Sequence, residues 1–115
     1  MPGATFDPYD VVVVPFPFTD RPATKRRPAL VVSDKGFNGP HAQLILAMIT
    51  SSQSSDWPSD VRLERWQAAG LTTACRVRMK LFTLDKTLVV SRLGVLAAED
   101  RRCVSRMVSA CLAIA

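Results

Sequence analysis

The sequence predicts a small α+β domain, mainly β, in which a strongly bent antiparallel sheet or barrel carries one C-terminal helix packed on it. Three observations support this fold class. The chain has 115 residues, 48% of them hydrophobic, which is enough for one domain with a buried core. Short apolar runs separated by turn residues occupy residues 11–96, and helical spacing of apolar residues follows them. We therefore expect a single domain over residues 1–115, without repeats or linkers.

Each strand is predicted from a run of apolar or β-branched residues bounded by glycine, proline or polar residues. In chain order, the expected strands cover residues 11–14, 29–33, 44–50, 61–64, 75–84 and 88–96. The expected loops and turns cover residues 19–27, 34–43, 51–60 and 67–74. After the first strand, Pro15 and Pro17 lack an N–H on the same side of the chain. This end should therefore lie on a sheet edge or outside the ladder, and Pro28 opens the second strand, where proline is tolerated.

The clearest alternation in the chain covers residues 75–84, where basic side chains alternate with apolar ones. The basic residues are Arg76, Arg78 and Lys80. Because successive side chains of a strand point to opposite faces, we expect one exposed basic face and one face in the core. No acidic residue occurs between Glu64 and Asp85. This stretch could form an electrostatic track for single-stranded nucleic acid, or simply a solvated strand face.

Residues 99–115 carry the helical pattern. The apolar side chains spaced for one helix face are Val104, Met107, Val108, Cys111 and Leu112. Glu99 and Asp100 fall in the first turn, where the positive end of the helix dipole favours acidic side chains. The basic residues expected to face water are Arg101, Arg102 and Arg106. One terminal helix after several strands completes the predicted order.

Composition narrows the classes of function. The net charge of +5 suits a polyanionic or acidic partner, although ordinary solubility would also account for it. No apolar run is long enough to span a membrane, and the first ten residues lack the pattern of a secretory signal. We therefore expect a cytoplasmic protein.

Cysteine and histidine usage argues against disulfide and metal chemistry. The three cysteines, Cys75, Cys103 and Cys111, contain no CxxC pair, and we expect them to be reduced and mostly buried. His41 is the only histidine, so a tetrahedral metal site is hard to build. We expect neither a metal nor a cofactor.

The stretch DVVVVPFPFTD at residues 10–20, followed by KRRPALVVS at residues 25–33, resembles the opening of PemK/MazF-family toxins of type II toxin–antitoxin systems. LAMITSS at residues 46–52 is similar to the family's apolar strand ending in Ile-Thr or Ile-Ser, and Gly70-Leu71 with RMKLFTLD at residues 78–85 is similar to a later strand. The matches run in order along nearly the whole chain.

The sequence departs from the family pattern at three places. Tyr9 stands where glycine is common, Cys75 stands where serine is common, and Ala97-Ala98 lack the usual polar helix cap. None of these departures removes a presumed catalytic residue. The resemblance implies a small SH3-like barrel of the CcdB/PemK type with a long terminal helix, assembled as a homodimer. It also implies ribosome-independent, metal-independent cleavage of single-stranded RNA such as mRNA at short motifs, and neutralisation by an antitoxin. We expect that antitoxin to carry an acidic, disordered tail that folds across a basic groove.

RNA carries its own nucleophile in the 2′-OH, so an enzyme can cleave it by orienting that hydroxyl and stabilising charge on the phosphate. The resemblance assigns these catalytic roles to Arg27, whose guanidinium can grip two phosphate oxygens, and to Thr50, whose hydroxyl can fix the phosphate. The expected products carry 2′,3′-cyclic phosphate and 5′-OH ends. Further candidates for RNA binding are Lys25, Arg26, Ser51, Ser52, Arg78 and Lys80.

Other interpretations stay open beside this one. Trp57, Trp66 and Phe18 could stack on bases, but packing is the more common role of such residues. His41 could act as a general base, but no family match supports that role. The chain could also be an inactive relative, or a CcdB-like gyrase-binding poison. Such a poison would depend on the last residues of the helix, and residues 111–115 have the composition of packing residues.

Overall fold

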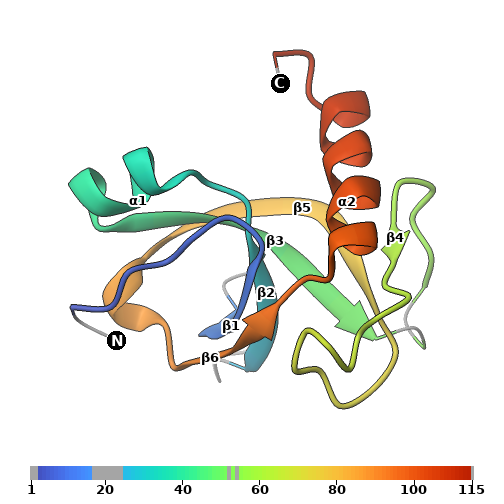
Figure 1. The fold of residues 1–115 in the computed structure, drawn as a ribbon, viewed down its shortest axis with the longest axis horizontal. Coiled ribbons are helices and arrows are strands. Elements are labelled where there is room, and N and C mark those ends of the chain that lie inside the picture. The colour runs from blue at the N-terminus through green and yellow to red at the C-terminus, as the bar shows by residue number, and fades with distance from the viewer. Residues whose placement is uncertain (1–2, 17–24, 52, 54, 115) are drawn as a thin grey trace.

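The computed structural model describes residues 3–16, 25–51, 53 and 55–114. In these residues six antiparallel strands form one curled sheet in the order β4-β5-β3-β2-β1-β6 (Figure 1). The strands are β1 Asp10–Pro15, β2 Arg26–Val31, β3 Gln43–Ser51, β4 Val61–Arg62, β5 Cys75–Asp85 and β6 Ser91–Val95. The helices are α1 Lys35–His41, the 3-10 turn η1 Lys86–Leu88 and α2 Ala98–Cys111. The predicted fold class, a bent antiparallel sheet with a C-terminal helix, is confirmed.

Strand β1 shows why a proline can follow four valines. On one side of β1, Pro15 still pairs with Arg26 of β2, and the next residue donates its N–H to the Lys25 carbonyl at 2.8 Å. On the other side, the ladder with β6 already ends at the pair Val13–Ser91. Because backbone groups alternate between the two sides, the nitrogen of Pro15 faces the side where the ladder has ended. The expectation for Pro15 is confirmed, and Pro17 lies outside the described residues.

Helix α1 replaces a predicted turn. Residues 34–43 contain two glycines and a proline, yet residues 35–41 are helical. The Asp34 carboxylate caps the helix by accepting the Gly36 N–H at 2.8 Å. Asn38 is buried, and its amide donates to the Ser33 carbonyl at 3.0 Å. These side-chain hydrogen bonds outweigh a weak helix propensity, and the spacing of apolar residues in the sequence does not reveal them.

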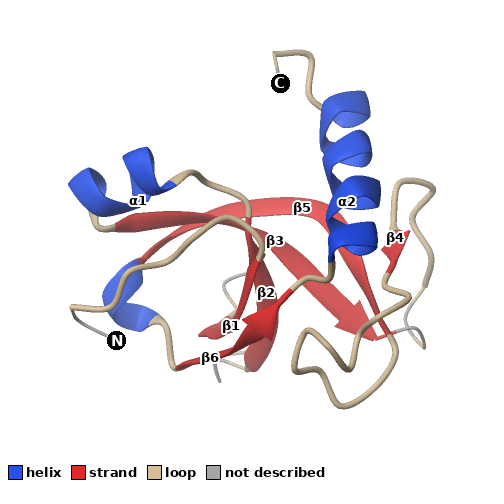
Figure 2. Ribbon diagram, in the orientation of Figure 1, coloured by secondary structure: helices blue, strands red, loops and turns tan. Residues whose placement is uncertain are grey.

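The sheet buries apolar side chains on both faces. One cluster, which α2 covers, includes Leu30, Ile49, Val77, Leu96 and Val104. The opposite cluster includes Phe6, Phe16, Leu46, Phe82 and Val89. Alternation along β1, β2 and β3 supplies both sets. Helix α1 lies beside the start of β3, and α2 stands beside β4 (Figure 2).

Helix α2 packs on the core through Val104, Met107 and Val108, and its last turn extends beyond the core. Val104 is buried, whereas Cys103, Cys111 and Leu112 are exposed, and the helix points away from the sheet toward the C-terminus (Figure 1). The expectation of mostly buried cysteines is therefore wrong for two of the three. Cys103 lies off the apolar face of the helix, and Cys111 lies where that face extends beyond the sheet. For the same reason the packing role expected of residues 111–115 is wrong for residues 111–114, which are exposed.

The first turn of α2 also binds the segment that follows β4. Ala97 occupies the cap position and makes no side-chain cap bond, as its sequence leads one to expect. Asp100 is buried and accepts the backbone N–H groups of Glu64 at 3.0 Å and Arg65 at 2.9 Å. This carboxylate therefore fastens the segment after β4 to the helix. Arg102 and Arg106 are exposed as expected, and Arg101 is half-buried.

Candidate active site

Two catalytic candidates meet where β2 begins and β3 ends. Ala29 of β2 pairs with Met48 of β3, and continuing this antiparallel register by two residues places Arg27 beside Thr50. Thr50 in turn pairs with Arg76 of β5. Because residues two apart on a strand share a face, the side chains of Arg27, Thr50 and Arg76 form one row across three neighbouring strands.

Arg27 is half-buried, and no described acidic residue is paired with it. Its guanidinium carbon lies 5.8 Å from the centroid of the Phe16 ring. Its Nε is buried and has no hydrogen-bond partner, and no carboxylate within the described part of the chain forms an ion pair with it. A buried donor left unsatisfied costs about 1–3 kcal/mol. The Arg27 guanidinium is therefore suited to bind an anionic ligand such as a phosphate, to which it would donate hydrogen bonds.

Two hydroxyls at the end of β3 point to opposite faces of the sheet. Thr50 is 3% exposed and shares the face of Arg27, whereas Ser51 is half-buried and lines a cleft of about 370 Å³. The cleft lies between the start of β2, the end of β3, the loop before β5 and one side chain of β6. Its lining includes Arg27, Pro28, Ser51, Thr72, Thr73 and Leu93. Ser52 lies outside the described residues.

Glycines shape one wall of this cleft. Gly70 has a φ of +82°, and a Cβ there would clash with the Leu93 carbonyl. Gly94 lets β6 approach closely, since a Cβ would come within 2.8 Å of the Ala69 backbone. Because neither position carries a side chain, the loop before β5 can lie directly against β6.

The basic face predicted for β5 is wrong for two of its three members. Arg76 is 3% exposed and Arg78 is 6% exposed. Arg78 donates from Nε to Asp60 Oδ1 at 3.0 Å and from Nη2 to Asp60 Oδ2 at 2.8 Å. Arg76 forms an ion pair with Asp56, lies 3.7 Å from Asp60 and donates to the Ser51 carbonyl at 3.1 Å. The acidic partners come from the loop after β3, which local alternation within β5 cannot reveal.

Asp60 and Arg78 each stabilise the ionised form of the other. Burial raises the pKa of Asp60, but hydrogen bonds from Arg78 and from the Trp57 N–H outweigh it and hold the pKa below its ordinary value. The same hydrogen bond to Asp60 raises the pKa of Arg78. Arg78 is thus a cation neutralised inside the protein, and its predicted contact with a phosphate would have to compete with Asp60.

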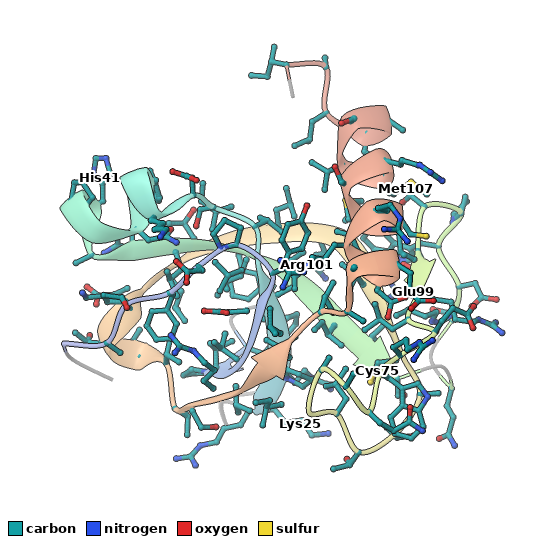
Figure 3. The ribbon with its side chains drawn as sticks, in the orientation of Figure 1. Lys25, His41, Cys75, Glu99, Arg101 and Met107 are labelled. Carbon is teal, nitrogen blue, oxygen red and sulfur yellow. The ribbon has the colours of Figure 1, made fainter. Side chains whose placement is uncertain are left out.

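The remaining basic candidates differ in exposure. Lys25 and Arg26 are exposed at the start of β2, close to Arg27 in the chain. Lys80 is half-buried and falls in an irregularity of β5, where the register with β3 skips from Arg78 to Leu81. Lys25 and Cys75 lie at the same end of the molecule (Figure 3).

His41 lies far from this end. It is exposed, its ring centroid lies 4.6 Å from that of Phe37, and Figure 3 shows it at the opposite end from Lys25 and Cys75. Within one chain, His41 is therefore remote from the start of β2, and its role as a general base has no support from the fold. Trp66 is half-buried against the core, and Phe18 is outside the described residues. Across the described ranges no group of three or more His, Cys, Asp or Glu could hold a metal ion. Nor does any described helix have the length and apolar content to cross a membrane.

The sequence interpretation missed part of this site. Asp56 and Asp60 were assigned only to a loop, and Arg76 only to a basic stretch. Thr72 and Thr73, which add hydroxyls to the cleft, also went unnoticed. No local signal marks any of these residues, because the sheet register and the loop after β3 bring them together.

A known protein family matches most of the chain. The family model described as PemK-like, MazF-like toxin of type II toxin–antitoxin systems matches residues 7–112. No curated protein matches the chain.

Solved structures of low sequence identity share the fold. MazF (Form-I) from Deinococcus radiodurans is similar at 22% identity and a TM-score of 0.72, over 93% of this chain and 96% of that one. The MazE-MazF structure (Form-III) from the same organism matches at 21% identity and a TM-score of 0.72, over 93% and 95% of the two chains. An endoribonuclease in complex with its cognate antitoxin, from a mycobacterial species, matches at 15% identity and a TM-score of 0.70, over 92% and 91%.

Proposed function

The chain belongs to the PemK-like, MazF-like toxins of type II toxin–antitoxin systems, and from this premise we propose that it is an endoribonuclease that cleaves single-stranded RNA without a metal. The observation that carries the proposal is the row of Arg27 and Thr50 across β2 and β3, in which Arg27 has a buried, unsatisfied Nε. The solved relative named as an endoribonuclease supports the same activity.

The proposed chemistry uses only the substrate and these side chains. The 2′-oxygen of RNA attacks the adjacent phosphorus, a bond forms between them, and the bond from phosphorus to the 5′-oxygen breaks. The net proton transfer runs from the 2′-oxygen to the 5′-oxygen, so no water is consumed and the ends are 2′,3′-cyclic phosphate and 5′-OH. Arg27 would stabilise the charge that develops on the phosphate oxygens, and the Thr50 hydroxyl would hold one of them.

The proposed assembly is a homodimer that an antitoxin neutralises. Exposed apolar side chains at the end of α2 and along β6 leave surface for a second copy to cover. The relatives solved as MazE-MazF and with a cognate antitoxin support a protein inhibitor. An acidic, disordered antitoxin segment would pair with exposed cations such as Lys25 and Arg26 and mask Arg27.

The test is cleavage of a long single-stranded RNA by the purified protein in EDTA, followed by end-group analysis. We expect the wild type to cut at a short motif and leave cyclic phosphate ends. Arg27→Ala and Thr50→Ala should each lower kcat by about 100- to 1000-fold, the effect of removing one donor to transition-state charge. Arg102→Ala, an exposed change on α2, is the matched control and should cut like the wild type.

A folded wild type that cuts no single-stranded RNA would overturn the enzyme assignment. Binding to an antitoxin and to gyrase would then be measured instead. Cleavage that persists at wild-type rate in Arg27→Ala would keep the activity but remove Arg27 from the mechanism.

A further inference from the structure

The loop after β3 presents an aromatic ring with one well-fixed side. Trp57 is 38% exposed, and the guanidinium carbon of Arg78 lies 4.7 Å from its ring centroid. The backbone N–H of Trp57 donates to Asp60 Oδ2 at 3.0 Å. A guanidinium stacked on an indole is a favourable cation–π contact. More than a third of the residue's surface remains exposed to solvent.

Several hydrogen bonds fix Arg78 and Asp60, the residues that contact Trp57. Asp60 accepts two hydrogen bonds from Arg78 and one from Trp57, and Arg78 also donates to the Ser55 carbonyl. The side chains of Asp60 and Arg78 are 5% and 8% exposed. A ring fixed in this way loses little conformational freedom when a ligand stacks on it.

Strand β5 connects the arginine that contacts the ring with the proposed reaction centre. Arg78 and Arg76 are two residues apart on β5 and share a face, which separates them by about 6.6 Å along the strand. Arg76 pairs directly with Thr50, the proposed phosphate-holding residue. A strand of RNA whose phosphate sits between Arg27 and Thr50 would therefore bring a neighbouring base toward Trp57.

We propose that Trp57 is the stacking platform for one base of the single-stranded RNA substrate, and that Arg78 and Asp60 are positioning residues for this platform. The inference rests on the proposed function. It also changes the role expected of Arg78. Instead of gripping a backbone phosphate, Arg78 acts through the indole that it supports. Aromatic side chains serve single-stranded nucleic acids in this way because every base has a π face.

The first experiment measures cleavage kinetics on a short RNA that contains the preferred motif. Trp57→Ala should raise KM by about 5- to 150-fold, the effect of losing one base stack, with a smaller change in kcat. Trp57→Phe keeps an aromatic face and should recover most of the affinity, whereas Trp57→Leu keeps apolar volume without a π face and should behave like Ala. Leu88→Ala, an exposed apolar change in η1, is the matched control.

The second experiment identifies the base. In a series of substrates with one abasic position each, a single position should abolish the difference between wild type and Trp57→Ala. In a Trp66→Phe background, a 2′-O-methyl oligonucleotide, which cannot be cleaved, should quench the remaining tryptophan fluorescence.

The outcomes separate this inference from the proposed function. If the wild type cuts RNA but Trp57→Ala has an unchanged KM and no abasic position matters, the stacking platform is overturned while the nuclease stands. If Trp57→Ala weakens only antitoxin binding, the ring is a protein contact and the inference is again wrong. If the wild type cuts nothing, the proposed function itself fails, whatever the oligonucleotide does to the fluorescence.

Discussion

Arg27 and Arg78 make a useful comparison, because both project from the same face of one sheet toward the candidate site. Arg78 donates two hydrogen bonds to the Asp60 carboxylate and contacts the Trp57 ring, so its charge is neutralised within the protein. Arg27 has a neighbouring phenyl ring but no carboxylate partner among the residues that the structure describes, and its Nε is buried and unsatisfied. A buried arginine that is paired with a carboxylate depends on that partner within the fold, whereas an arginine without a paired carboxylate can bind an anionic ligand.

The largest effect that tests this comparison is on stability. Asp60→Ala removes the carboxylate and leaves Arg78 buried without its partner, which should lower the free energy of unfolding by about 3–5 kcal/mol. Arg27→Ala should change it by less than about 1 kcal/mol, because it removes a donor that is unsatisfied in the free protein. Urea denaturation of both variants checks the contrast.

A double variant sharpens the same point. Replacing both partners, as Asp60→Leu with Arg78→Met, should recover most of the lost stability, since two matched apolar groups need no solvation. If the double variant is as unstable as Asp60→Ala, the loss reflects packing of the loop rather than an unpaired charge.

Local patterns predict much of the fold but little of this contrast. Valine runs, alternation and helical spacing depend on neighbouring residues, so the strands and the terminal helix follow from them within a few positions. The partners of Arg76 and Arg78 lie in a separate loop, and the adjacency of Arg27 to Thr50 follows from sheet register. The pair of Arg27 and Thr50 that we propose as catalytic was therefore predictable only through the family resemblance.

Tyr9 shows how a departure from the family pattern acquires a physical meaning. The family commonly has glycine there, and Tyr9 adopts a φ of 73°, the left-handed region that glycine occupies without strain. Its N–H donates to Val31 and its carbonyl accepts from Leu96, so the strained residue is held between β2 and the start of α2. Arg101 lies 5.3 Å from the ring centroid and adds a contact that glycine cannot make. The sequence alone marked the position but not its conformation.

Low pH should reduce the contribution of the Asp60–Arg78 ion pair to the stability of the fold. The folded-state pKa of Asp60 is lowered, so its contribution to stability is present above the unfolded pKa, near 3.8, and is lost as pH falls through the folded value. The Tm of the wild type should therefore exceed that of Asp60→Asn at neutral pH, and the difference should shrink below about pH 4. Thermal melts of the two proteins from pH 7 to pH 3 measure it. A Tm difference that stays constant over this range would mean that Asp60 does not titrate with folding.

The smallest effect concerns Arg26, the exposed neighbour of half-buried Arg27. An exposed cation that contacts RNA adds screened, sequence-independent attraction, so Arg26→Ala should weaken binding of an uncleavable single strand about equally for all sequences. The logarithmic salt dependence should fall by about 0.7, the value for one phosphate contact on a single strand. Binding titrations between 50 and 200 mM salt resolve this change, with exposed Arg102→Ala as the control. An unchanged salt slope would remove Arg26 from the RNA path and confine the electrostatic contact on β2 to Arg27. If Arg26→Ala instead lowers kcat as strongly as Arg27→Ala, the lack of a carboxylate partner among the described residues does not distinguish the arginine proposed as catalytic, and the comparison with Arg78 fails.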